Sequence, residues 1–69
     1  MKISARNQIK GTITSIETGA VTSIVAIDIG TAVIKSSITN DAVADLGLKV
    51  GDAAYAIVKA SNVIVGVDH

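Results

Sequence analysis

The chain has 69 residues, six basic and six acidic side chains, 49% hydrophobic residues and no cysteine. A chain of this length forms at most one domain, here residues 1–69, and buries only about 60% of the surface that its unfolded form exposes. Proteins of this size usually gain stability from disulfides, a metal or oligomerisation. Disulfides are excluded, and one terminal histidine with scattered carboxylates gives no metal-ligand spacing. We therefore expect a homo-oligomer.

The balanced charge and the single aromatic residue, Tyr55, argue against a nucleic-acid surface, which needs clustered cations and stacking platforms. No apolar stretch approaches the roughly 20 residues of a membrane span. The polar start of the chain does not resemble a secretory signal. We expect a cytoplasmic protein with neither a membrane nor a nucleic-acid partner.

The first half of the chain has the residue alternation that is typical of strands. Gly11 lies within a β-branched run and indicates a bulge or a strong bend. Glu17-Thr18-Gly19 and Gly30-Thr31 predict turns between strands. Three strands are therefore predicted, at residues 9–16, 20–29 and 32–38.

A short helix is predicted next. Thr39 or Asn40 suits its N-cap, and Val43 and Leu46 are spaced as on one helix face. Gly47 is placed to end the helix in a left-handed conformation.

The last third of the chain returns to the strand pattern after a loop at residues 48–52. A fourth strand is predicted at residues 53–59, a corner at Ser61-Asn62, and a fifth strand with Val63, Val65 and Val67 on one face. Five strands with one helix between the third and the fourth is the element order of an all-β, OB-like barrel. A small open β-sandwich is the alternative.

Few side chains in the sequence are able to do catalytic chemistry. Asp41 and Asp45 lie four residues apart on the predicted helix, which favours a solvated face over an acid–base pair. There is no cysteine nucleophile, and the glycines lack the spacing of a phosphate-binding loop. We expect no enzyme, no catalytic residue and no cofactor.

The two ends of the chain each combine a cation with small hydrogen-bond donors, in Ser4-Ala5-Arg6-Asn7-Gln8 and Lys59-Ala60-Ser61-Asn62-Val63. Arg6 offers a planar donor fork suited to an oxyanion, and Lys59 offers a compact positive charge. Serine and asparagine side chains donate without adding charge. These residues predict an anion-binding module. The alternatives are a surface ion pair for Arg6 and a solvated strand end for Lys59.

Both segments, the first extended to Gly11 and the second to Val65, resemble the molbindin family. Its members are small molybdate- and tungstate-binding proteins built from the Mop-type domain, which also occurs in molybdate-responsive regulators and molybdate transporter ATPases. The resemblance covers essentially the whole chain and includes the predicted helix and the turn after it, residues 42–51. The two end motifs are specific when they are taken jointly.

The resemblance implies an OB-like barrel assembled as a hexamer, a trimer of dimers, with oxyanions between subunits and no protein atom bound directly to the metal. The implied ligand shell, supplied by adjacent chains, is Ser4, Ala5, Arg6, Lys59, Ala60 and Ser61. Asn7 belongs to the same motif and either contacts the ligand or fixes the turn. The family also has oxyanion sites on symmetry axes, for which the candidates here are Gly19, Ala20, Val21 and Thr22.

The resulting expectation is a cytoplasmic protein that binds molybdate or tungstate as a store or buffer. Two other hypotheses stay open. One is a small OB-fold protein that binds single-stranded nucleic acid. The other is a structural or regulatory oligomer in which Arg6 and Lys59 form salt bridges between subunits.

Overall fold

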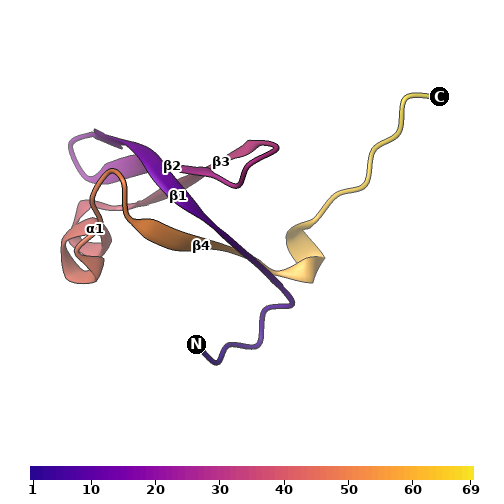
Figure 1. The fold of residues 1–69 in the computed structure, drawn as a ribbon, viewed down its shortest axis with the longest axis horizontal. Coiled ribbons are helices and arrows are strands. Elements are labelled where there is room, and N and C mark those ends of the chain that lie inside the picture. Colours follow the sequence, from indigo (N-terminus) through magenta and orange to yellow (C-terminus); the bar gives the residue numbers. More distant parts are fainter.

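The computed structural model describes all residues, 1–69, and consists of one curled antiparallel sheet with one short helix (Figure 1). The spatial order of the strands is β3-β2-β1-β4. The elements are β1 (Asn7–Thr18), β2 (Thr22–Asp28), β3 (Val33–Thr39), α1 (Asn40–Leu46), β4 (Ala53–Val58) and a 3-10 turn (Ala60–Asn62).

The long strand β1 holds the sheet together because it pairs with two neighbours in succession. Its first half pairs with β4 from Asn7↔Val58 to Thr12↔Ala53, and its second half pairs with β2 from Thr12↔Asp28 onward. A strand that changes partners in this way must bend, and the bend curls the sheet.

The sequence predicted a bulge or a strong bend at Gly11, and the structure shows a close backbone approach there instead of a bulge. A Cβ at Gly11 would collide with the backbone carbonyl of Asp28 and lie 2.8 Å from Cγ2 of Ile27, so only glycine allows this close approach. The register shift of β1 lies between Ile13 and Ser15 instead. The bulge therefore lies a few residues after Gly11.

The core of the single chain is small. Only six residues are buried, and they are Ile13, Ser23, Val25, Ala26, Ile27 and Ala56. Four of them form the central cluster, and side chains such as Ile38, Val43 and Leu48 pack against it. Thirteen large hydrophobic side chains stay exposed. The surplus of apolar residues seen in the sequence thus remains at the surface of the single chain.

Helix α1 begins and ends as predicted. Thr39 is the N-cap, and its side chain accepts a hydrogen bond from the N–H of Ala42 at 3.1 Å. Gly47 adopts a left-handed conformation with φ 62°, and its N–H bonds to the carbonyl of Ala44. No helix of the chain is long and apolar enough to cross a membrane.

The prediction of a fifth strand was wrong for the single chain. Residues 63–69 form no strand, and their side chains are all exposed. β3 and β4 are the two edges of the sheet, and no segment pairs between them, so the chain alone forms an open curled sheet with four strands and no sandwich. The apolar alternation of residues 63–67 predicts an extended segment, but a strand also needs a neighbour with free hydrogen-bonding groups. The nearest edge strand of its own sheet, β4, ends at Val58, where the chain turns away.

The remaining differences concern element ends. β1 runs from Asn7 to Thr18, so Glu17 and Thr18, which were predicted to form the turn, belong to the strand. β2 begins at Thr22 because the preceding residues form the turn, in which the N–H of Gly19 bonds to the carbonyl of Thr22 at 2.8 Å. β4 ends at Val58, one residue before Lys59.

Candidate functional site

The pairing of β1 with β4 brings the two end motifs together. Asn7, the first residue of β1, is opposite Val58, the last residue of β4. Arg6 directly precedes this pair on one strand and Lys59 directly follows it on the other, so both cations lie at the same end of the sheet (Figure 1). The strand pairing thus places two positive charges at one end of the sheet.

The two motifs also share a groove. One open groove of about 520 Å³ is lined by residues of both extended motifs: Asn7 and Ile9 from the first, and Val58, Ala60, Val63 and Val65 from the second. Arg6, Lys59 and Ser61 are exposed beside it, and Ala5 and Asn7 are half-buried. Five of the six lining residues are apolar and Asn7 is the one polar residue among them, so neither cation belongs to the walls of this groove.

Backbone turns orient the donors of each motif. After Lys59 the chain forms a 3-10 turn in which Asn62 donates its N–H to the Lys59 carbonyl at 2.9 Å and Val63 donates to the Ala60 carbonyl at 3.2 Å. These bonds occupy carbonyl groups, whereas the N–H groups of Ala60 and Ser61 take part in no hydrogen bond of the turns or side chains. The corner therefore offers donors and few acceptors.

In the first motif, the side chain of Gln8 occupies a backbone carbonyl. No separate role was predicted for Gln8 from the sequence. Its Nε2 donates to the carbonyl of Ala5 at 3.1 Å and closes the loop that carries Arg6. The sequence signal for this bond was a glutamine placed three residues after a small residue, just where the strand begins. Because the bond removes an acceptor from the loop, it favours an anion there.

The charges are separated although the chain is neutral overall. Residues 1–16 and 53–67 contain four cations (Lys2, Arg6, Lys10 and Lys59) and no carboxylate. Five of the six acidic residues lie between residues 17 and 52. The first half of β1, β4 and the segment after it therefore form an edge that attracts anions.

The second set of candidates lies elsewhere. Gly19, Ala20, Val21 and Thr22 form the turn between β1 and β2, at the opposite end of β1 from Asn7. The structure therefore separates these residues from Arg6 and Lys59 within one chain (Figure 1).

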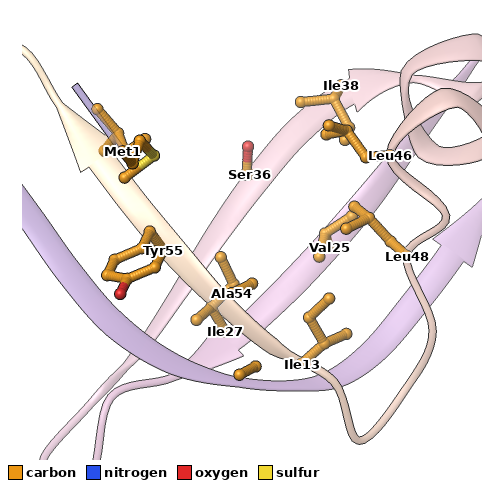
Figure 2. A pocket seen from close by; sticks show the side chains of 12 residues that line it. Met1, Ile13, Val25, Ile27, Ser36, Ile38, Leu46, Leu48, Ala54 and Tyr55 are labelled. Carbon is orange, nitrogen blue, oxygen red and sulfur yellow. The ribbon is translucent and has the colours of Figure 1, made fainter. Parts of the chain in front are cut away.

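Another groove, of about 420 Å³, lies between β3 and β4 and has apolar walls (Figure 2). Side chains such as Val25, Ile27, Ile38 and Leu48 line it, and Ser36 is the one small polar side chain among them. This groove has no cation in its lining, and neither Arg6 nor Lys59 is next in sequence to a lining residue. No group of three His, Asp or Glu side chains is placed to hold a metal ion.

The fold and the site define a small OB-like β-domain with a cationic, carboxylate-free edge. The family model described as the TOBE domain matches residues 3–65. The chain belongs to the TOBE-domain family, and its relatives confirm the resemblance to the molbindins.

Three relatives show how far the similarity extends. The probable molybdenum-pterin-binding protein of Haemophilus influenzae is 56% identical over 69 residues, which are 99% of this chain and 100% of that protein. A molybdate-binding protein from Sporomusa ovata superposes with a TM-score of 0.92 at 39% identity, over 97% of this chain and 100% of that one. The cytoplasmic molybdate-binding protein ModG, solved with molybdate bound, has a TM-score of 0.92 at 49% identity and covers 99% of this chain and 49% of ModG.

Proposed function

We propose that this protein binds molybdate and tungstate in the cytoplasm as a store or buffer and does not act as a catalyst. The observation that carries the proposal is the β1–β4 register, which places Arg6 and Lys59 together at an edge without carboxylates. The printed names of the relatives, which are molybdate- or molybdenum-pterin-binding proteins, support the choice of anion.

The chemistry of the edge suits a tetrahedral dianion. Molybdate and tungstate stay deprotonated at neutral pH and need only donors, which the proposed shell of Ser4, Ala5, Arg6, Asn7, Lys59, Ala60 and Ser61 supplies. Phosphate carries a proton near neutral pH and needs an acceptor for it. A buried donor that finds no acceptor costs about 1–3 kcal/mol, and the proton of phosphate would be such a donor in a shell made only of donors. Phosphate should therefore bind more weakly. Selection against sulfate then depends on cavity size.

We further propose that the anion is held between subunits of a hexamer, a trimer of dimers. The small core supports oligomerisation, because thirteen large hydrophobic side chains are exposed in one chain. The exposed position of Arg6 and Lys59 supports a shared site, because one chain by itself leaves an ion at this edge open to solvent.

The segment after the 3-10 turn supports the same proposal. Ile64 is 92% exposed and Val65 is 87% exposed, although both are large and apolar. An extended apolar segment with free backbone groups is suited to pairing with an open sheet edge of a second copy. The apolar groove between β3 and β4 could receive this segment from a second copy, since both strands are edges of the sheet.

Calorimetric titration of the purified protein with molybdate, tungstate, sulfate and phosphate tests the proposed function. We expect the first two anions to bind and phosphate not to bind measurably. Arg6→Ala and Lys59→Ala should each weaken molybdate binding at least about tenfold, because each removes a charge-assisted donor worth about 1.5–3 kcal/mol. Lys49→Ala is the matched control, since Lys49 lies in the loop before β4 and outside the edge.

Two results would overturn the proposal. One is wild-type protein that neither releases heat nor gains thermal stability with molybdate or tungstate. The other is normal binding by both Arg6→Ala and Lys59→Ala, which would place the anion elsewhere.

A further inference from the structure

A single hydrogen bond holds the segment that carries Arg6. Nε2 of Gln8 donates to the carbonyl of Ala5 at 3.1 Å. The backbone hydrogen bonds of the turns and loops include none from residues 1–6, and the other side-chain hydrogen bonds lie elsewhere in the chain. The position of residues 4–6 relative to β1 therefore depends on the side chain of Gln8.

Strand pairing fixes the place from which this side chain reaches back. Gln8 is the second residue of β1, is paired with Ile57 of β4 and is exposed. A glutamine amide can face a carbonyl only through its nitrogen, because its oxygen is an acceptor as well. The contact between Gln8 and Ala5 is therefore a donation to the carbonyl, and it leaves the loop one acceptor short.

The carbonyls of the two motifs are occupied in different ways. The 3-10 turn occupies those of Lys59 and Ala60 with its own N–H groups. These two bonds join backbone groups, so a change of side chain does not remove either donor or acceptor. The Ala5 carbonyl is occupied by a side chain. Among these three carbonyls it is thus the one that a substitution can free.

We infer that Gln8 determines which oxyanions the cationic edge accepts, by withholding the Ala5 carbonyl from anions that carry a proton. The inference rests on the proposed function, because it concerns the same anion site. A carbonyl only accepts hydrogen bonds, whereas a serine hydroxyl can donate or accept. The state of the Ala5 carbonyl therefore decides whether the loop has a dedicated acceptor. Gln8 acts through this carbonyl and is a positioning residue outside the ligand shell.

A free Ala5 carbonyl should have opposite effects on two kinds of anion. Molybdate and sulfate carry no proton at neutral pH, so a carbonyl lone pair that faces them repels them. The same lone pair accepts the proton of phosphate. One net hydrogen bond corresponds to a change in affinity of roughly two- to tenfold. The affinity for phosphate relative to molybdate therefore reports whether the carbonyl is occupied.

The test measures relative affinities in variants of this one side chain. Gln8→Met has a similar length but no donor, and Gln8→Lys keeps a donor within similar reach. In calorimetric competition titrations at neutral pH, phosphate or sulfate is used to displace molybdate. Gln8→Met should raise the affinity for phosphate relative to molybdate about fivefold and leave that for sulfate relative to molybdate within about twofold of wild type. Gln8→Lys should keep both wild-type ratios.

Lys10→Met is the matched control, because it removes a cation from the same exposed face of β1 without freeing a carbonyl. It should weaken the binding of all three anions by the same factor. A merely structural role of Gln8 would also leave the ratios unchanged, since a loosened loop binds every anion less well. Unchanged ratios in Gln8→Met, or a gain for phosphate that sulfate shares, would overturn the inference while the Arg6-dependent binding stands.

A second measurement holds even if the Gln8 variants fold poorly. A crystal structure of the wild-type protein with molybdate should still show Nε2 of Gln8 within hydrogen-bond distance of the Ala5 carbonyl. A molybdate complex in which Gln8 has left this carbonyl would overturn the inference. Wild-type protein that binds no molybdate at all would overturn the proposed function as well.

Discussion

At the scale of single residues, this protein uses small side chains to control where backbone polar groups point. Gln8 occupies the carbonyl of Ala5 beside one candidate site, and Asn40 occupies the carbonyl of Gly19 beside the other. Each bond removes an acceptor and leaves nearby donors free. A neutral amide side chain can therefore favour an anion without adding charge.

Gly11 is the residue at which the backbone tolerates least change. We expect Gly11→Ala to destabilise the protein by about 1–3 kcal/mol, the usual cost of overpacking, because the new Cβ would meet the Asp28 carbonyl. Thr12→Ala, at the exposed neighbouring position of β1, is the control, since it places no new atom beside the Asp28 carbonyl. Denaturant unfolding at one fixed protomer concentration measures the difference. Equal midpoints for both variants would contradict the close approach at Gly11.

At the scale of elements, the strand β1 does most of the organising. It pairs first with β4 and then with β2, so one strand links the cationic edge at Asn7 to the turn at Gly19. Helix α1 contributes through its first residues rather than its length, since Thr39 caps it and Asn40 binds the turn. Substitutions at Thr39 therefore affect the helix cap, whereas substitutions at Asn40 affect the turn.

The N-cap provides a prediction at this scale. Thr39→Ala should cost about 1 kcal/mol of stability because the N–H of Ala42 loses its acceptor, and Thr39→Ser should retain most of it. Thermal unfolding of the two variants side by side measures the effect. If Thr39→Ser were as unstable as Thr39→Ala, the side-chain hydroxyl would not be the capping group.

At the scale of the whole molecule, one chain does not bury enough surface to explain its composition. Six buried residues stand against thirteen exposed large hydrophobic ones. A core of this size is marginal by itself. An assembly that covers the segment after residue 62 would bury these exposed hydrophobic side chains. The same assembly would shield the cationic edge from solvent.

We expect Val65→Asp to break the assembly into smaller species, because a carboxylate would be buried at an interface without a partner. Val50→Asp is the matched control, because Val50 is also exposed (62% against 87%) but lies in the loop before β4. Light scattering after gel filtration measures the mass of each variant. Identical masses for Val65→Asp and wild type would exclude residues 63–67 from the interface.

Much of the fold follows from local patterns. The alternating residues predicted β1 to β4, and Thr39 and Gly47 predicted both ends of α1. The fifth strand could not be decided in this way, because an apolar alternating segment becomes a strand only where a second edge is available. The position of the bulge was also missed, since it depends on where β1 changes partners and not on the glycine alone.

The sequence by itself determined the chemistry of the side chains: which residues carry charge and which donate hydrogen bonds without charge. Only the tertiary structure decided which of these groups meet. The register Asn7↔Val58 joins the two end motifs, and the bond from Asn40 to Gly19 links residues that no local pattern connects. The physical reason is that side-chain chemistry is a property of each residue, whereas strand pairing and long-range hydrogen bonds depend on contacts between distant parts of the chain.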